Sequence, residues 1–241
     1  MKFSIAPVAF SFLKFNNNNN EISPSIPINS IAHLQSWFTG VFDNIKQVNN
    51  EKNIPDPRDK HYYVTANFTT YPNNTNAMLA SYYYGTNTSD VFRFRYYKFQ
   101  PLERNDLPNK IPILSNIYNI FRYPKTLIQM KICRPSLLTI SKLKANKYDL
   151  SAYYPNESDF EYIPTGDILW QYIHLTSKYE GSLLADKCII YSQINPAVKL
   201  TAYDNLTLRP NSISIKDRVY NDKGQLIIGN RRGIPYDLQR I

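Results

Sequence analysis

The 241-residue chain has little of the residues that define several common protein classes. Its two cysteines, Cys133 and Cys188, lie far apart and form no CxxC pair, so the sequence predicts no disulfide framework. A single disulfide bond between Cys133 and Cys188 is left as an open alternative. Only three histidines, His33, His61 and His174, could serve as partners for a reactive thiol, which argues against a cysteine nucleophile. We also expect no metal centre.

Long apolar runs and long basic runs are absent too. No apolar stretch approaches the roughly 18 residues of a membrane span. Lys and Arg are spread along the chain without a run of five, and no zinc-finger or helix-turn-helix spacing is present, so nucleic acid is not an expected partner. The net charge of +9 leaves two interpretations open: attraction to an acidic partner or ligand, and a basic surface without a specific role.

What the chain does have is aromatic residues. There are 20 Tyr and 12 Phe against 7 Gly, a composition that favours β-strands and argues against a disordered chain. The length suits one large all-β domain. Heavy use of Asn, Ile, Tyr and Lys is also typical of an AT-rich genome, so part of this composition reflects codon supply.

The first fifty residues divide into two parts. Residues 1–29 contain a short apolar stretch, a run of Asn and a Ser/Pro/Ile segment, which predicts a disordered low-complexity extension, with a targeting segment as the alternative. Residues 30–48 predict one helix that begins at an N-cap, Ser30. Its apolar face would pack into one end of a barrel and comprises Leu34, Trp37, Phe38, Val41, Phe42 and Ile45.

The chain then changes to strand patterns. We expect strands at 61–71, 77–84 and 91–98, joined by short turns that contain Asn or Gly. In the third strand, Arg93, Arg95 and Tyr97 alternate with Phe92, Phe94 and Tyr96 and so lie on the opposite face. The spacing leaves open whether the arginine face is solvated or points into a barrel, where it could hold carboxylates.

Further strands complete an all-β pattern with minor α structure. A helix or strand is expected at 113–121, a short helix at 137–143 and strands at 126–133, 148–154, 168–175, 187–191, 198–203 and 206–215. The final hairpin turns at Asn221, Asp222 and Gly224 and continues through 225–229. We predict that residues 30–241 form an antiparallel β-barrel that this hairpin closes and the N-terminal helix caps at one end.

Both ends of the chain carry a recognisable pattern. Trp37, Gly40, Phe42, Asn44 and Gln47 are spaced as W-x-x-G-x-F-x-N-x-x-Q, and the chain finishes with Asp217-Arg218, Asp222, Gly224, Gly229 and Gly233-Ile-Pro235-Tyr236. Between them lie Val91-Phe-Arg93-Phe-Arg95-Tyr and the pair Gly181 and Cys188. In this order, from about residue 31 to 241, the chain resembles the CpcT/CpeT chromophore-lyase family. It departs from the family at Val219, which replaces a Gly, and it lacks a Trp before Gly229.

The resemblance implies a lipocalin-like barrel that binds an open-chain tetrapyrrole, a phycobilin. It also implies a lyase that attaches the bilin through a thioether to a cysteine of a phycobiliprotein β subunit. Arg93 and Arg95 would hold the propionates, since arginine pairs with carboxylates through charge-assisted hydrogen bonds. Asp217 would be the catalytic residue that accepts from the pyrrole N–H groups, and Tyr97 and Arg218 would line the cavity wall. Because the acceptor thiol belongs to the client protein, we expect Cys188 to be a packed strand residue.

Two other functions stay open. The first is a carrier of haem or another tetrapyrrole without transfer, which the missing Trp and the Asn-rich extension favour. The second is a structural or interaction protein that keeps the barrel and no ligand. Beyond the bilin no cofactor is implied, and a homodimer is open. The lyase function implies a plastid or a cyanobacterium-like cell, whereas an N-terminal signal would imply a secreted or vacuolar protein.

Overall fold

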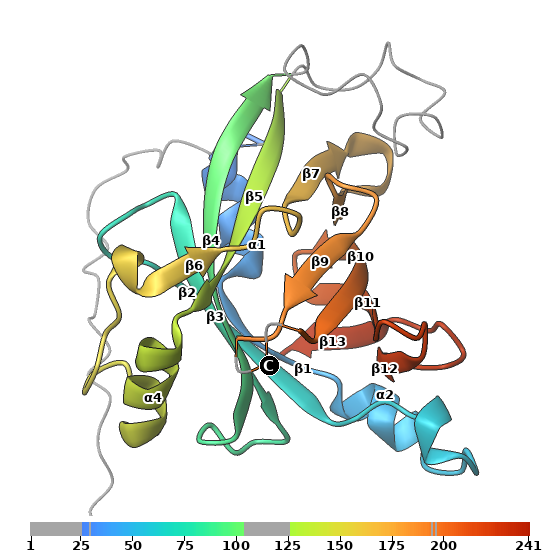
Figure 1. Ribbon diagram of the computed structural model, residues 1–241. Coiled ribbons are helices and arrows are strands. Elements are labelled where there is room, and N and C mark those ends of the chain that lie inside the picture. The colour runs from blue at the N-terminus through green and yellow to red at the C-terminus, as the bar shows by residue number, and fades with distance from the viewer. Residues whose placement is uncertain (1–25, 29, 104–125, 194, 196) are drawn as a thin grey trace, which may run out of the picture.

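Ten antiparallel strands form a closed barrel, as the sequence predicts (Figure 1). The structure is a computed structural model that describes residues 26–28, 30–103, 126–193, 195 and 197–241. Around the ring the strand order is β1-β2-β3-β4-β5-β7-β8-β10-β11-β13, and β13 pairs back onto β1. The short strands β6, β9 and β12 extend the wall beside β5, β10 and β11.

The ring strands are β1 (Gly40–Asp43), β2 (Val64–Thr70), β3 (Ala77–Tyr84), β4 (Val91–Glu103), β5 (Thr126–Pro135), β7 (Ile168–Ile173), β8 (Lys178–Leu183), β10 (Lys199–Arg209), β11 (Ser212–Tyr220) and β13 (Tyr236–Arg240). The additional strands are β6 (Phe160–Tyr162), β9 (Cys188–Tyr191) and β12 (Leu226–Ile228). The helices are α1 (Ile31–Phe38), α2 (Ile45–Asn50) and α4 (Leu137–Ala145), with 3-10 turns η1 (Pro57–Asp59), η4 (Glu157–Asp159) and η5 (His174–Thr176).

The strand that closes the barrel is β13. It lies between β11 and β1, with Leu238 opposite Ile213 and Arg240 opposite Phe42. The predicted turn after β11 is present, since the Gly224 N–H donates to the Asn221 carbonyl at 3.0 Å. The prediction that this hairpin closes the barrel is wrong, because β12 pairs only with the end of β11.

The predicted helix over 30–48 is interrupted by β1. Ser30 caps α1 as expected, accepting from the His33 N–H at 3.1 Å. The helix stops at Thr39 because Gly40 adopts a φ of +131°, and a Cβ there would collide with the Arg240 guanidinium. That guanidinium donates to the carbonyl oxygens of Trp37 and Thr39 and so caps the end of α1. The face that looks helical in the sequence is thus divided among α1, β1 and the start of α2.

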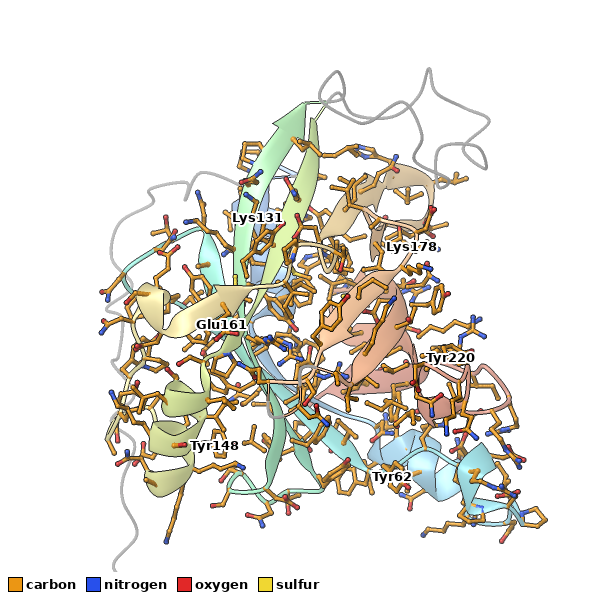
Figure 2. All side chains as sticks on the ribbon, viewed as in Figure 1. Tyr62, Lys131, Tyr148, Glu161, Lys178 and Tyr220 are labelled. Atoms are coloured by element: carbon orange, nitrogen blue, oxygen red, sulfur yellow. The ribbon has the colours of Figure 1, made fainter. Side chains whose placement is uncertain are left out.

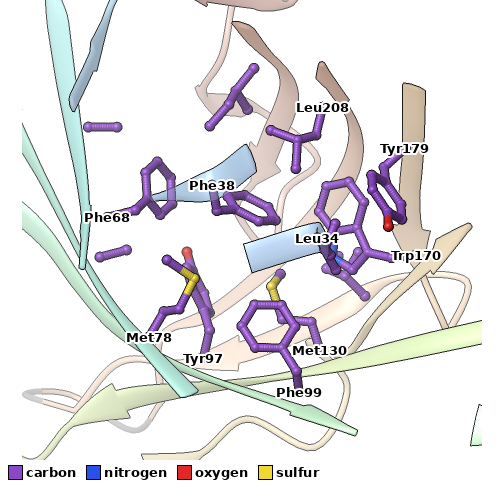
Figure 3. Close-up of a cluster of buried hydrophobic side chains, with 14 of the residues drawn as sticks. Leu34, Phe38, Phe68, Met78, Tyr97, Phe99, Met130, Trp170, Tyr179 and Leu208 are labelled. Atoms are coloured by element: carbon purple, nitrogen blue, oxygen red, sulfur yellow. The ribbon is translucent and has the colours of Figure 1, made fainter. Parts of the chain in front are cut away.

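Helix α1 packs into one end of the barrel interior, as predicted (Figure 3). Leu34 and Phe38 are buried and lie between opposite walls of the barrel. The Phe38 ring lies 5.3 Å from Phe68 on β2 and 5.2 Å from Trp170 on β7, measured between ring centroids. Burying an apolar side chain of this size stabilises a fold by roughly 1.5–3 kcal/mol, so α1 makes this end of the barrel a packed core.

A second apolar layer covers the outside of β3 and β4. Helix α4, expected at 137–143, has Ser136 as its N-cap and packs Leu143 against this face. The prediction of a strand at 148–154 is wrong, because Lys147 and Tyr148 have φ values of +52° and +58° and start a turn. The aromatic residues of that segment cover the outer wall instead, and Tyr71, Tyr96 and Phe160 belong to the same cluster.

The strands predicted at 198–203 and 206–215 are wrong in their bounds, because the observed strands are β10 and β11 with the turn at 210–211. Asp204-Asn205 is typical of a turn in sequence, yet β10 passes through it without a break and turns only after Arg209. Strand β8 was not predicted as a separate strand. The element expected at 113–121 and the extension expected at 1–29, apart from 26–28, lie outside the described residues.

Gly181 offers a test of the packed half of the barrel. It lies opposite Trp170, and a Cβ on Gly181 would come within 2.8 Å of three carbons of the indole ring. We predict that Gly181→Ala lowers the free energy of unfolding by about 1–3 kcal/mol through overpacking, as measured by urea denaturation. The neighbouring Ser182→Ala faces outward and should change it by less than about 0.5 kcal/mol. Equal effects of the two substitutions would contradict the proposed packing.

Candidate ligand cavity

Strand β4 runs from the open end of the barrel to the end filled by α1. Its inward side chains are Arg93, Arg95, Tyr97 and Phe99 in that order, because alternate residues of a strand point to the same face. Phe99 belongs to the packed core, where its ring centroid lies 6.3 Å from that of Phe38. The arginine face that the sequence left undecided therefore points into the barrel.

The open half contains two adjoining cavities. The larger, of about 550 Å³, opens at the barrel mouth between η1, β12 and the ends of β2, β3 and β4. The smaller, of about 80 Å³, lies deeper, and we call it the inner chamber. Tyr82, Arg93, Ile215 and Asp217 line both cavities, so these residues form the boundary between them.

An ion pair crosses this boundary. Arg93 Nη2 donates to Asp217 Oδ2 at 2.6 Å, and the side chains are 26% and 8% exposed. Asp217 raises the pKa of Arg93 well above its usual range, so the guanidinium is charged. The Arg93 guanidinium also lies 5.7 Å from the centre of the Tyr82 ring. Both predicted residues are thus in the cavity, and they are bonded to each other.

Arg95 differs from Arg93 in having no such partner. Its Nη1 donates to the Phe94 carbonyl at 2.8 Å, and no carboxylate among the described residues lies within ion-pair distance of it. Burial and then the charge of Arg93 lower the pKa of Arg95 to about 10, which still leaves it charged at neutral pH. A buried cation without a counter-charge is costly, so Arg95 is a ready site for an anionic group.

Asp204 is a cavity residue that the sequence analysis missed. It lies directly opposite Asp217 in the β10–β11 pair and lines the inner chamber. Burial and then the neighbouring Asp217 raise the pKa of Asp204 to about 7. The signal in the sequence was the alternation of Ala202, Asp204, Leu206 and Leu208, which shares one face once 199–209 is taken as one strand.

Two tyrosines complete the polar wall of the inner chamber. The hydroxyl groups of Tyr82 and Tyr97 lie 3.1 Å apart, and burial raises the pKa of each. Both hydroxyls are therefore neutral at physiological pH and can donate as well as accept. Tyr97 lines the inner chamber, and its role toward a ligand stays a prediction.

Arg218 does not reach the cavity, so its predicted position on the cavity wall is wrong. Neighbouring residues of a strand face opposite sides, and with Asp217 inside, Arg218 lies on the outer face of β11. There it lines a shallow groove with Lys187, Lys199 and Tyr220, the last of which is labelled in Figure 2. Among the described residues, its buried Nε has no hydrogen-bond partner.

Ion pairs hold the mouth of the larger cavity in place. Arg231 pairs with Asp56 and Asp59 at 2.5 and 3.1 Å, and Arg232 pairs with Glu51 at 2.6 Å. These contacts join the loop that contains η1 to the loop after β12. The basic pair near the chain end is thus already neutralised, unlike Arg95.

The rim of the mouth is aromatic and exposed. Tyr62 is 70% exposed and lies beside α2 in Figure 2, and Phe92 is 42% exposed. The rings of Phe92 and Tyr84 stack with centroids 4.5 Å apart. Exposed aromatic groups around a cavity are typical of sites that bind a large apolar surface.

The two cysteines have no place in a catalytic arrangement. Both are free, and burial raises the pKa of Cys133 to about 11 and that of Cys188 above its usual value. Cys188 is a packed strand residue, as expected. Across the described ranges, no three acidic, His or Cys side chains gather as a metal site. The helices described by the structure are all too short or too polar to span a bilayer.

The site thus belongs to a closed barrel with an aromatic mouth and an internal cation, Arg95, that forms no ion pair with any described residue. A solved structure of the CRL protein of Arabidopsis, a plant protein, is similar to this fold, with a TM-score of 0.55 over 88% of this chain and 97% of that chain. The two chains are 14% identical, so the match supports a shared barrel fold and nothing finer. No protein-family model matches the sequence, and no curated protein does.

Replacing one partner of the ion pair tests its place in the fold. We predict that Asp217→Asn lowers the free energy of unfolding by about 1–3 kcal/mol, because Arg93 is left with a neutral partner. Chemical denaturation at pH 7 measures the change. Asp222→Asn removes a carboxylate on the outer groove and should change it by less than about 0.5 kcal/mol. A stability of Asp217→Asn equal to that of the parent would contradict a contribution from this pair.

Proposed function

We propose that the protein binds an open-chain tetrapyrrole, a phycobilin, in the open half of its barrel and attaches it to a cysteine of a phycobiliprotein β subunit. The observation that supports this proposal most is Arg95, a cation inside the barrel that has no carboxylate partner in the part of the chain that the structure describes and lies next to a cavity open to solvent. Such a site suits a ligand with an apolar body and a carboxylate at one edge.

The chemistry of a bilin fits these walls. Each propionate can form charge-assisted hydrogen bonds with an arginine, worth roughly 1.5–3 kcal/mol each. We assign one propionate to Arg95 and the other to the outer side of Arg93. The long π system would lie in the larger cavity against Tyr84 and Phe92, and a volume of about 550 Å³ is within the roughly 300–1,000 Å³ of ligand pockets.

Asp217 keeps the role that the sequence suggested. A carboxylate can accept about four hydrogen bonds, so Asp217 can hold Arg93 and still accept from pyrrole N–H groups. A carboxylate beside the pyrrole nitrogens favours the protonated pigment, which is the better electrophile.

The orientation follows from where the charges lie. In a coiled bilin the two propionates project from one edge, and rings A and D lie at the opposite edge. With the propionates at Arg95 and Arg93, ring A would lie at the barrel mouth. A client cysteine could then reach ring A without entering the barrel, with Tyr62 and Phe92 in contact with the client. This reaction implies a plastid or a cyanobacterial cell.

A second function uses the same cavity without transfer. Val219, which stands where the resembling family has Gly, lines the inner chamber and helps to restrict it to about 80 Å³. A pigment that binds in the larger cavity and does not enter the inner chamber would favour the second function, a carrier of haem or another tetrapyrrole. The two functions differ in whether the bound pigment is passed to a thiol.

Titration with biliverdin, an open-chain tetrapyrrole, tests binding by its absorbance. We predict saturable binding that Arg95→Gln weakens about 10- to 100-fold, which is the loss of one or two charge-assisted hydrogen bonds. Arg209→Gln, at the exposed end of β10, should bind as the parent does. Equal affinities of these two variants, or no binding to the parent, would overturn the proposal. Haem in the same titration identifies the alternative carrier.

Incubation of the phycobilin-loaded protein with apo-phycobiliprotein β subunit tests transfer. We predict a thioether adduct that survives denaturation, and an at least tenfold slower transfer by Asp217→Asn when its circular dichroism shows that it is folded. Unchanged binding and transfer by this variant would remove Asp217 from the site. Binding without any adduct in the parent would leave the carrier function.

A further inference from the structure

The inner chamber holds a second carboxyl group, Asp204, for which the proposed function has no role. It lies opposite Asp217 across β10 and β11, and both side chains point into the same 80 Å³ space. The ion pair with Arg93 satisfies Asp217. Among the described residues, no cation lies within ion-pair distance of Asp204, although Arg95 lines the same chamber.

The surroundings of Asp204 decide its protonation. The charged and titratable groups that face the chamber are Arg93, Arg95 and Tyr97 on β4, Tyr82 on β3, Cys188 on β9 and Asp217 on β11. Burial contributes most to raising the pKa of Asp204, the charge of Asp217 contributes next, and a side-chain hydrogen bond to Asp217 adds to the shift, while the two arginines oppose it. Tyr82, Tyr97 and Cys188 are neutral at physiological pH, since burial raises the pKa of each. A proton is therefore the natural counter-charge for the second carboxyl.

We propose that Asp204 determines whether the inner chamber accepts a carboxylate: when Asp204 is neutral, Arg95 attracts a ligand carboxylate by charge, and the carboxyl proton that Asp204 shares with Asp217 can be donated to the ligand instead. The inference rests on the proposed function and adds a specificity-determining residue to it. In the ionised form, Asp204 repels the same ligand group. With a protonated Asp204, the chamber carries two arginines against one carboxylate, and its net positive charge is neutralised by one propionate.

The consequence is a pH-dependent affinity with a defined sign. A propionate is ionised above about pH 5, as a glutamate side chain is, so its own charge does not change between pH 6 and 8.5. Asp204 loses its proton in this range, and the ligand carboxylate then meets an anion. The affinity for a carboxylate ligand should fall as the pH rises, by about tenfold per pH unit above the pKa of Asp204.

Asp204→Asn is the informative variant, because an amide keeps a hydrogen-bond donor and cannot ionise. We would measure the dissociation constant of biliverdin and of its dimethyl ester from pH 6 to 8.5 in the full chain. For the parent protein, we expect the biliverdin constant to rise at least tenfold and the ester constant to stay level. For Asp204→Asn, the dissociation constants of biliverdin and of the ester should both stay unchanged across this pH range. Asp222→Asn serves as the control, since it removes an outer carboxylate and should follow the parent.

A biliverdin affinity of the parent that does not change with pH, or an unchanged pH dependence in Asp204→Asn, would overturn the role of Asp204. Absence of biliverdin binding at every pH would overturn the proposed function instead. The protonation state of Asp204 can be measured separately, by a carboxyl ¹³C NMR titration of the pigment-free protein. Comparison with Asp204→Asn assigns the resonance of Asp204. Asp204 fully ionised at pH 5 would refute the inference whatever the pigment does, and titration close to neutral pH would support it.

Discussion

The pairing of β13 with β1 is the contact on which the rest of the structure depends. It converts an open, curved sheet into a ring, and a ring has no unpaired edges. The same strand supplies Arg240, which caps the last carbonyls of α1 and occupies the space beside Gly40. Strand β13 therefore closes the barrel and also caps the helix that packs inside it. The extent of the packed core and of the open cavity thus depends on the same strand.

The division of the interior into two halves gives the barrel its chemistry. Where α1 enters, aromatic and aliphatic side chains from opposite walls pack to a solid core. Beyond the last turn of the helix, no element among the described residues fills the space, and β4, β10 and β11 present charged groups to it. Apolar side chains such as Met130, Ile132 and Ile168 also line the inner chamber, and low polarity strengthens electrostatic attraction. The ion pair of Arg93 with Asp217 and the attraction of Arg95 for an anion are therefore stronger there than at a surface. One barrel thus combines a stable core with a polar, half-open cavity.

The alternation along β4 predicted correctly that Arg93, Arg95 and Tyr97 share a face, because strand geometry is local. Which face is inside depends on ring closure, which is not local, and the spacing left it open. Asp204 was missed for a related reason: Asp-Asn is common in turns, and only the pairing with β11 shows that the strand continues. Arg218 was misplaced because the resemblance assigned it beside Asp217, although adjacent strand residues point to opposite sides. The break of the first helix at Gly40 depends on a guanidinium from the far end of the chain, which no local pattern contains.

That long-range dependence has a consequence for how the barrel forms. Thr39 and Arg240, which meet at the end of α1, are 201 positions apart in the sequence. Contacts across such a span form slowly, because the conformational entropy of the long intervening chain is lost before the contacts contribute any stability. During synthesis, one edge of β1 stays unpaired until β13 has been made. The end of α1 likewise lacks its cap until Arg240 has been added. The protein should therefore be a slow folder whose nascent chain is most exposed to aggregation just before the ring closes.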